Sequence, residues 1–486
     1  MTLLVQPGLL SAAQLRQAAD RNNCTRVTAI LMASGTRDPE AFARHFPDAE
    51  IISLPGIVNH GVPSMPSVPL HTQYDTVLRQ ILSDPRTMYL VERSWRKHGF
   101  LSVFNNIPAV EVGVWNTISV LGQLAVKAMV LQATPHRIDT WVFARVAELL
   151  GVFVCFTSHS VIEGRTEMLA GIDEQEPLLP RRLKTGGVHQ ATRDLLAAKR
   201  ANYEKGIPEY EKKRQLRYRN RFWNTRHEIA TWFSGSWKVT PLRMLESFRK
   251  ARSLAQYNKL AQQFLPKRPF IIFFPHYQPE RTTLPEGGWY AHQWLAIRAL
   301  SDAAAMNGWE VVYKEHPSTF RQPWNSTFRD QSFFREVSRL GNVHIAPLSM
   351  DPFSLIDRSV ASATLTGTSI LESVARGKPV LAFGKHVPRG LLGVHVVDSL
   401  EAVHRAVHEI AGGAGMPDTE STERFLKVVQ ERTFARDQQV NTSLDAFAEL
   451  LALASEKEFP STACSIGSTE DPEPVSTTQG WSPDVD

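Results

Sequence analysis

The stretch ASATLTGTSILESVARGKPVLAFG, residues 361–384, contains a strand, a helix and a second strand in close succession. The largely apolar run Ala361–Thr366 predicts a buried strand, and the sequence that follows the turn predicts a helix over Ser369–Arg376. Gly367 permits the tight turn between them, and Val380–Phe383 predicts the next strand. A strand, a helix and a strand in this order favour a parallel sheet with a right-handed crossover.

The same alternation continues on the N-terminal side of this unit. Strands are predicted over Phe270–His276, Glu310–His316 and Val343–Pro347. Helices are predicted near Trp289–Met306, Phe328–Leu340 and Pro352–Arg358. The C-terminal half is therefore predicted to form a doubly wound sheet.

The first half of the chain repeats the pattern less regularly. Strands are predicted over Arg26–Met32, Glu50–Leu54, Met88–Arg93, Met129–Thr134 and Val152–Ser158, and the clearest helix over Ile138–Leu150. The fold class expected is α/β, with two Rossmann-like domains of the GT-B type, a helical connector and a disordered C-terminal tail. The expected boundaries are an acceptor-side domain at 1–165, a connector at 166–265, a nucleotide-sugar domain at 266–415, a final helix pair at 416–455 and an acidic tail at 456–486.

Length and composition agree with two packed domains. The chain has 486 residues, which is more than one hydrophobic core usually serves, and 43% of them are hydrophobic. No apolar run approaches the roughly 18 residues that span a bilayer, and the first ten residues do not resemble a secretory signal. Three widely spaced cysteines favour neither a zinc site nor a disulfide framework. We therefore expect a cytoplasmic protein.

Basic and aromatic residues gather between Lys199 and Arg226. Such a segment suits a polyanion, an anionic membrane surface or RNA. The alternative is a solvated helical connector whose aromatic side chains face a core. We expect no nucleic-acid partner, whereas peripheral contact with the inner face of an anionic membrane or with an acidic glycan stays open.

The turn at residues 366–369 is the clearest candidate site. Ligands of open parallel sheets bind beyond the carboxyl ends of the strands, where Thr366, Gly367, Thr368 and Ser369 lie. Hydroxyl groups and free backbone N–H groups at the start of a helix suit a phosphate. The alternative is an ordinary capping box, because Glu372 follows Ser369 by three residues.

Two further groups follow neighbouring strands. Lys314 and His316 alternate along a strand end, so both side chains are expected on one side, where their charge suits a phosphate ester. Gln278 and Glu280 follow the strand that ends near His276, and their amide and carboxylate suit a base, a ribose or a sugar hydroxyl. The alternatives are a surface strand end and a solvated loop.

Three ordered segments, HYQPERTT (276–283), YKEHP (313–317) and TGTSILESVARGKPVLAFG (366–384), resemble the bacterial capsule polysaccharide biosynthesis family, which includes the Kdo transferases of capsule assembly. The resemblance covers about residues 265–400. It implies a GT-B glycosyltransferase with an inverting, metal-independent mechanism and no cofactor. It also implies a nucleotide-sugar donor, often CMP-linked, and a surface or capsular polysaccharide or glycolipid as acceptor.

Site residues follow from this resemblance position by position. Lys314 and His316 match the family's Lys-x-His-Pro element near the donor phosphate, and residues 366–369 match its phosphate-binding turn. Glu372 matches its helix acid, and Gln278 and Glu280 match its Gln-Pro-Glu element. The basic segment 199–226 has no counterpart in this pattern, which leaves the acceptor open.

An inverting transfer also needs a base for the acceptor hydroxyl, and a positive environment for the departing phosphate. The base is expected from the N-terminal domain, where Glu92 and Asp139 are favoured over His136, His159 and Glu163. Each of these side chains also has a purely structural interpretation, as an ion-pair partner, a helix cap or a loop residue.

Two other functions stay open at this point. A nucleotide-sugar 2-epimerase or a polyol-phosphate transferase would use a similar architecture and a similar turn. A non-catalytic protein that binds a polyanion or a membrane through residues 199–226 would not need the turn at all.

Overall fold

The computed structural model describes twelve segments of the chain. They are residues 2–8, 10–21, 27–32, 38–53, 73–98, 107–181, 188–201, 240–263, 266–278, 281–320, 329–437 and 442–456. The C-terminal tail predicted at 456–486 and the basic segment beyond residue 201 lie almost entirely outside these residues.

The C-terminal sheet is parallel throughout its described strands. These are β8 (Phe270–Phe274), β9 (Glu310–Tyr313), β10 (Val343–Ile345), β11 (Ala361–Thr364), β12 (Val380–Ala382) and β13 (Val394–Val396). Their order across the sheet is β10-β9-β8-β11-β12-β13, with parallel neighbours. This is the order of the doubly wound Rossmann fold, so the topological switch point lies between β8 and β11.

Helices cover both faces of this sheet. Alternate residues of β8 separate the two faces, with Ile271 and Phe273 in one apolar cluster and Phe270 and Ile272 in another. The first face is covered by α12 (Thr240–Leu260), α13 (Trp294–Met306), α14 (Gln331–Arg339) and α17 (Leu400–Ala411). The second is covered by α15 (Pro352–Arg358) and α16 (Ser369–Ala375). The short helices η3 (Gly288–Ala291) and η4 (Pro317–Phe320) follow loops after β8 and β9.

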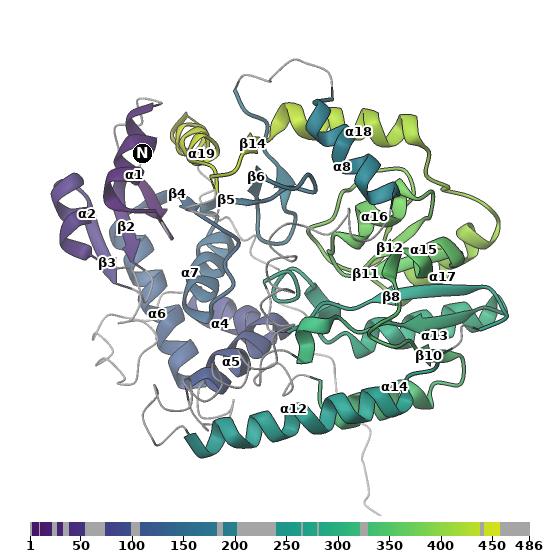
Figure 1. Cartoon of the computed structure of the whole chain (residues 1–486). Coiled ribbons are helices and arrows are strands. Elements are labelled where there is room, and N and C mark those ends of the chain that lie inside the picture. The colour runs from purple at the N-terminus through teal and green to yellow at the C-terminus, as the bar shows by residue number, and fades with distance from the viewer. Residues whose placement is uncertain are drawn as a thin grey trace, which may run out of the picture.

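The N-terminal sheet has a parallel part and an antiparallel edge (Figure 1). Its strands are β1 (Thr2–Gln6), β2 (Val27–Met32), β3 (Glu50–Ser53), β4 (Val126–Leu131), β5 (Phe153–His159), β6 (Arg165–Ala170), β7 (Glu176–Pro177) and β14 (Phe434–Ala435). The order β3-β2-β1-β4-β5 is parallel and again of Rossmann type, with its switch point between β1 and β4. The strands β6, β7 and β14 extend it in antiparallel fashion beyond β5.

Two apolar layers cover this sheet. One contains α4 (Tyr74–Ser83), α5 (Pro85–His98), α6 (Ile107–Gln123) and α7 (Ile138–Leu149). The other contains α1 (Ala12–Arg21), α2 (Pro39–His45) and, from the far end of the chain, α19 (Leu444–Glu456). The fully buried Phe447 and Leu451 of α19 pack beside Leu3 and Val130 of the central strands.

The two halves are joined through α8 (Gln190–Arg200) and α18 (Thr419–Arg432). Leu196 of α8 and Leu426 of α18 share an apolar cluster with Leu371 of α16 and with Ile162, which lies between β5 and β6. Beyond α18 the chain returns to the N-terminal sheet, where Arg165 of β6 donates to the carbonyl of Gln430 over 3.0 Å. The C-terminal residues therefore belong structurally to the N-terminal half.

The predicted fold class, two Rossmann-like α/β units, is confirmed. One predicted strand is wrong, because Met88–Arg93 lies inside the helix α5, which begins at Pro85. Proline is favoured at the first position of a helix, so Pro85 marks a helix start, and a short apolar run fits a buried helix as well as a strand. The strands β1, β6 and β13 were not predicted. Within the described residues, no helix is both long and apolar enough to span a bilayer.

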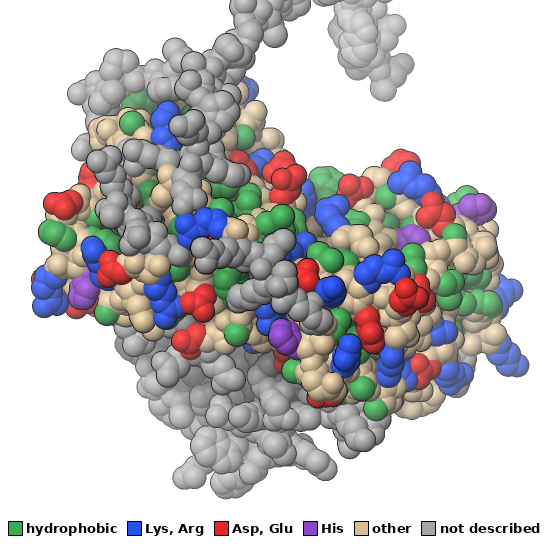
Figure 2. Space-filling view, turned by 90° about the horizontal axis from the view of Figure 1, so that it is seen from above, with side chains coloured by type: hydrophobic (Ala, Val, Ile, Leu, Met, Phe, Trp, Pro, Cys, Tyr) green, Lys and Arg blue, Asp and Glu red, His purple; other side chains and the backbone are tan. Residues whose placement is uncertain are grey.

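Cationic and acidic side chains alternate over the upper face of the molecule, which carries α18 and α8 (Figure 2). The described residues on this face do not form a field of one sign. The expected contact with an anionic membrane or polyanion stays a prediction, since the segment that motivates it lies outside the described residues.

Candidate functional site

The loop that follows β8 contacts both switch points. On the N-terminal side, Thr134 after β4 donates its hydroxyl to Glu286 Oε1 over 3.1 Å. Arg93 of α5 donates to the carbonyl of Leu284 over 3.1 Å. Leu284 itself packs into the apolar cluster of the N-terminal domain. The carboxyl ends of the two parallel sheets therefore meet at residues 281–288.

On the C-terminal side, the same loop contacts the predicted phosphate turn. The hydroxyl of Thr366 donates to the carbonyl of Thr282 over 3.1 Å. The amide of Thr366 donates to Nε2 of His276 over 3.3 Å, which leaves the proton of this ring on Nδ1, 3.2 Å from the hydroxyl of Thr282. One of the turn's backbone donors is therefore already satisfied by His276.

The next three amides of this turn remain available. Within the described part of the chain, the N–H groups of Gly367, Thr368 and Ser369 donate to no acceptor, although Ile370 already donates to Gly367. Thr368 is exposed and its neighbours are half-buried. Consecutive free amides beside a histidine can bind an anionic oxygen.

Gly367 and Gly384 are required by close packing at this turn. A Cβ atom on Gly367 would lie 2.9 Å from Nε2 of His276 and 3.1 Å from the hydroxyl of Thr364. A Cβ atom on Gly384 would lie 2.1 Å from Cγ2 of Thr366. Neither position has room for a side chain, so the turn is fixed from both sides.

Glu372 is held by an ion pair from α8. Its Oε1 lies 3.2 Å from Nζ of Lys199, and the two side chains are only 13% and 3% exposed. The capping-box alternative is not what the structure shows, because the N-cap of α16 is Thr368 and makes no side-chain capping bond. The carboxylate contacts Lys199 at the α8 interface.

Lys314 and His316 contact neighbours on opposite sides of β9. Nζ of Lys314 is buried and donates to the carbonyl of Leu348, beyond β10, over 3.2 Å. Burial lowers the pKa of Lys314 to about 8, although the negative charges of Glu315 and Asp351 act to raise it. The His316 ring lies 5.2 Å from that of Tyr277, beyond β8. Because β9 ends at Tyr313, strand alternation does not extend to these residues.

Gln278 supports the loop rather than pointing to open space. Its Nε2 donates to the carbonyl of Ala291 in η3 over 2.6 Å. Its predicted partner Glu280 lies outside the described residues. The backbone beside it is fixed by Arg329, which is fully buried, pairs with Glu315 and donates to the carbonyl of His276 over 2.6 Å.

The two favoured base candidates occupy different environments. Asp139 lies in the first turn of α7 and is buried, where it accepts from Arg137 over 3.0 Å and from the amide of Thr140 over 2.8 Å. Glu92 is half-buried on α5. It lies near His292, the residue that follows η3, where its charge opposes the lowering of the His292 pKa by burial. Asp139 is thus already paired, and Glu92 lies close to His292 of the other domain.

His136 lies at the N-terminal switch point in a form suited to accept a proton. Its Nδ1 lies 2.9 Å from the carbonyl of Thr134, so Nδ1 carries the hydrogen and Nε2 carries the lone pair. Burial, assisted by Arg93 and Arg281, lowers the pKa of His136 to about 4. Among the described residues no partner contacts Nε2.

His159 is excluded from the same role by its partner. Nη1 of Arg436 donates to Nδ1 of His159 over 2.6 Å, which consumes the lone pair. Burial, Arg281 and Arg436 lower the pKa of His159 to about 3. Its carbonyl accepts from Nε2 of His386 over 2.8 Å, and that ring also lies 3.3 Å from the carboxylate of Glu167. Although burial opposes it, Glu167 raises the pKa of His386 to about 9.

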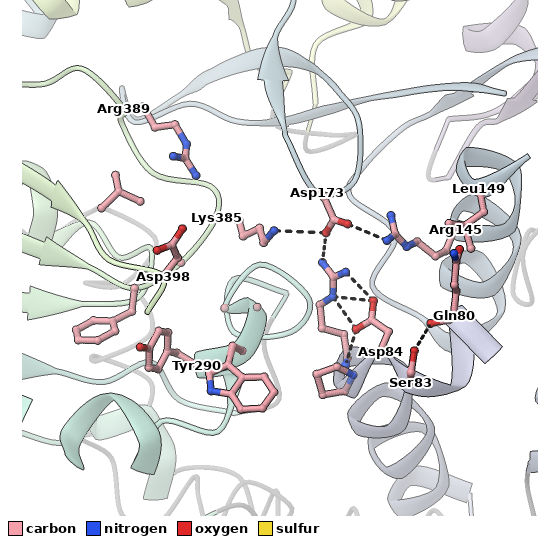
Figure 3. A pocket seen from close by; sticks show the side chains of 18 residues that line it. Gln80, Ser83, Asp84, Arg145, Leu149, Asp173, Tyr290, Lys385, Arg389 and Asp398 are labelled. Atoms are coloured by element: carbon pink, nitrogen blue, oxygen red, sulfur yellow. Dashed lines mark hydrogen bonds and ion pairs between the residues drawn. The ribbon is translucent and has the colours of Figure 1, made fainter. Parts of the chain in front are cut away.

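A cavity of about 650 Å³ opens between the domains beside this region (Figure 3). Its N-terminal wall comes from the end of α4, the start of α5, α7 and the turn at Asp173. Its C-terminal wall comes from η3 and from the segments that follow β12 and β13. The lining residues that matter below are Asp84, Arg86, Arg145, Asp173, Trp289, Lys385, Arg389 and Asp398.

None of the residues predicted as site residues lines this cavity. It abuts the predicted turn, because its lining residue Gly384 packs on Thr366. The sequence offered two weak signals for it, the tryptophan of GGWY at 287–290 and the basic segment KHVPR at 385–389. Neither has a spacing that specifies a site without knowledge of which loops meet.

No metal cluster is found in the described part of the chain, where no three His, Cys, Asp or Glu side chains gather in a suitable arrangement. The expected independence from metal stays a prediction.

Comparisons with known proteins give fold-level similarity to enzymes that use nucleotide sugars. No family model matches the chain, and no curated protein matches it. Among solved structures, a UDP-GlcNAc 2-epimerase from Methanocaldococcus jannaschii aligns over 88% of this chain and 99% of its own, with 12% identity and a TM-score of 0.26. The β Kdo 2,4 transferase of KpsC from Thermosulfurimonas dismutans aligns over 67% of this chain and 87% of its own, with 12% identity and a TM-score of 0.30.

The calicheamicin glycosyltransferase CalG4 aligns over 94% of this chain and 99% of its own, with 12% identity and a TM-score of 0.21. The structural neighbours thus include both transferases and epimerases. Values this low assign none of their activities to the chain, and the function has to be argued from the site.

Proposed function

We propose that this chain is an inverting, metal-independent glycosyltransferase that moves a sugar from a nucleotide-sugar donor to a saccharide acceptor. The observation that carries the proposal is the meeting of two switch points at one loop. Free amides follow β11 on one side, and a neutral histidine follows β4 on the other. A transfer of this kind needs an anion site for the leaving group and a base for the acceptor at opposite sides of one cleft.

The leaving phosphate is assigned to the amides of Gly367, Thr368 and Ser369. The donor's nucleotide then lies over the carboxyl ends of β8 and β11, with His316 two strands away. Adjacent strands lie about 4.8 Å apart, so β9 and β11 are separated by about 10 Å, a span that a nucleotide and its phosphate can bridge. Gln278, Lys314 and Glu372 are assigned supporting roles through the segments they fix, whereas a role for Glu280 rests on the family resemblance alone.

The acceptor's proton is assigned to Nε2 of His136, with Glu92 and Asp139 as the other candidates. Among the described residues no partner contacts Nε2 of His136, whereas Asp139 already accepts two hydrogen bonds. Arg93 and Arg281 lie close enough to His136 to lower its pKa. Arg281 also pairs with Glu286 over 3.1 Å, and Arg93 donates to the carbonyl of Leu284.

The first test is a thermal-shift screen of the full chain with CMP, CDP, UDP and GDP. A ligand that binds only the native state raises the melting temperature with its concentration. We expect one nucleotide to stabilise the chain strongly, with CMP as the expected one from the family resemblance. Absence of any nucleotide-dependent shift would overturn the proposal.

The second test follows the nucleotide sugar itself by NMR, with and without candidate acceptors. A transferase consumes donor and releases nucleotide faster when an acceptor is present. Conversion of the donor to a second nucleotide sugar without acceptor would instead identify a 2-epimerase. Transfer of a polyol phosphate rather than a sugar would show in the phosphorus spectrum.

A further inference from the structure

We propose that the cavity between the domains binds the acceptor, and that this acceptor is an acidic saccharide. The proposal rests on the transferase function proposed above and names the substrate class of its second site. Three observations carry it: an exposed tryptophan, two cationic side chains of which Lys385 has an ion-pair partner and Arg389 has none among the described residues, and the position of the cavity beside the proposed reaction centre.

An indole platform opens into the cavity. Trp289 is 62% exposed, although a ring of this size is normally largely buried in a folded domain. The flat face of an indole matches the apolar C–H face of a pyranose ring. A Cβ atom added at Gly288, next to the indole, would lie 3.7 Å from Cγ and Cε of Lys385, so the Lys385 side chain lies beside this platform. A sugar ring stacked on the indole would therefore lie next to a cationic side chain.

The charged groups of the cavity divide into paired and available ones. Asp173 lies between Arg86 at 2.6 Å, Arg145 at 2.8 Å and Lys385 at 3.5 Å (Figure 3). Burial alone would raise the pKa of Asp173, but these three cations lower it to about 2. The network is preassembled, and its weakest member is Lys385, whose side chain is 39% exposed.

Arg389 and Asp398 are the available groups on the C-terminal wall. Both are exposed, and among the described residues Arg389 makes no ion pair. With Lys385, Arg389 offers two cationic donors from one short segment to a carboxylate or phosphate on the ligand. Asp398 offers acceptors for sugar hydroxyl groups, which a bare phosphate or a nucleobase would not use. An acidic saccharide satisfies all three side chains.

The cavity adjoins the proposed reaction centre through two loops. Glu286, which accepts from Thr134 near His136, immediately precedes the lining residues Gly287 and Gly288. The amide of Lys385 donates to the carbonyl of Glu286 over 2.8 Å. A saccharide stacked on Trp289 therefore lies next to the loop that contacts both Thr134, beside the proposed base, and the proposed phosphate turn.

The binding experiment uses the full chain and a panel of tetrasaccharides. The acidic members carry uronate or phosphate groups, including one of alternating glucuronic acid and N-acetylglucosamine, and the neutral member is chitotetraose. Affinities are measured by calorimetry and by saturation-transfer NMR at low and high salt. We expect at least one acidic member to bind more tightly than chitotetraose, with an affinity that falls as salt rises.

Two substitutions identify the site. Trp289→Ala should weaken every saccharide that binds by about tenfold, because it removes the stacking surface. Arg389→Gln should weaken acidic members while leaving chitotetraose unchanged. The matched controls are Phe248→Ala, an aromatic residue that is 59% exposed elsewhere, and Arg405→Gln on α17.

The outcomes separate this inference from the transferase proposal. If no acidic member binds, or if binding is unchanged in Trp289→Ala, the inference about the cavity is wrong. A nucleotide-dependent thermal shift in the same chain would still support the transferase proposal. Conversely, saccharide binding that depends on Trp289 in a chain that binds no nucleotide would retain the cavity as a saccharide site and remove its role as acceptor site. In an active enzyme, Trp289→Ala should raise the acceptor KM and leave the donor KM unchanged.

Discussion

Gly367 is the residue on which the proposed phosphate site depends most directly. In Gly367→Ala the new Cβ atom would meet Nε2 of His276 at 2.9 Å, so either the ring or the turn must move. Overpacking of this kind costs about 1–3 kcal/mol, and the displaced amides lose their common direction. We expect nucleotide affinity to fall by at least about tenfold, which corresponds to about 1.4 kcal/mol, as measured by calorimetry.

Gly341→Ala is the matched control for this change. Gly341 lies in the same domain, between α14 and β10, and nothing within 4 Å would meet its Cβ atom. Its nucleotide affinity should equal that of the unmodified chain. Equal affinities for Gly367→Ala and Gly341→Ala would mean that the turn does not bind the phosphate.

His136 gives a second prediction at the residue scale. His136→Gln keeps a polar side chain of similar length but cannot accept a proton, so kcat should fall by about 10²–10⁴-fold while nucleotide affinity stays unchanged. Glu92→Gln and Asp139→Asn, made in parallel, should lower kcat much less. Steady-state rates and nucleotide titrations measure both quantities. If Glu92→Gln is instead the variant that loses kcat, Glu92 is the base and His136 only lines the cleft.

The residues that sequence could identify are those whose role is local. The turn at Thr366 was found because a strand end, a glycine and two hydroxyl residues are consecutive in the chain. The direction of the Lys314 side chain cannot be identified in this way, because β9 ends one residue earlier and its hydrogen-bond partner, the carbonyl of Leu348, lies on another loop. The partner of Glu372 could not be predicted either, since Lys199 lies far away in the sequence.

At the scale of elements, α8 and α16 are clamped by reciprocal contacts. Lys199 pairs with Glu372, and Arg376 donates to the carbonyl of Lys199 over 3.0 Å. Removing one partner of a buried pair leaves the other charge uncompensated, which typically costs about 3–5 kcal/mol. We expect Lys199→Met to lower the free energy of unfolding by about 3 kcal/mol, measured by urea denaturation.

A double-mutant cycle separates this pair from simple loss of packing. Lys199→Met combined with Glu372→Leu should recover much of the lost stability, because no buried charge then remains. Lys427→Met, on the exposed face of α18, should change stability little. If the double variant is as unstable as the sum of the single variants, the ion pair is not what holds α8 on α16.

The strands of both sheets were predictable where they are buried on both faces. Phe270–Phe274 and Phe153–Phe156 are continuous apolar runs, as expected for central strands covered by helices. The run Met88–Arg93 shows the limit of this signal, because a short apolar run fits a buried helix equally well. The five-residue run of β1 does not reveal from sequence that it lies between β2 and β4 in the sheet.

For the whole molecule, sequence could predict two Rossmann units but not how the chain ends. β14 and α19 return to the N-terminal sheet, where Phe447 and Leu451 fill one of its two apolar layers. An apolar stripe predicts that a helix packs against another element, but which element it contacts depends on the path of the preceding loop. The interdomain cavity has the same origin, because its walls come from segments that are remote in sequence and meet only in the assembled molecule.

The contact between the domains also makes a prediction about pH. His386, which follows β12, is buried against Glu167 of β6, and its pKa is raised from the ordinary value of 6.5 to about 9. A base with a raised pKa stabilises the folded state fully below the unfolded pKa, and this contribution is lost as the pH rises through the folded pKa. The free energy of unfolding should therefore decrease between about pH 6.5 and pH 9 by up to about 3 kcal/mol.

His386→Gln isolates this contribution from the other titrating groups. The glutamine can still donate to the carbonyl of His159 but carries no charge for Glu167. Urea denaturation of both proteins at a series of pH values gives the difference in unfolding free energy, which should be largest near pH 6.5 and below, fall as the pH rises, and vanish above about pH 9. His136 and His159, whose pKa values are lowered to about 4 and 3, act in the opposite direction below pH 6.5. Because His386 is one of the groups that lower the pKa of His159, the two proteins are compared above pH 6.5. A difference that is the same at pH 7 and pH 10 would show that His386 binds across the interface as a neutral ring, and that no charge joins β12 to β6.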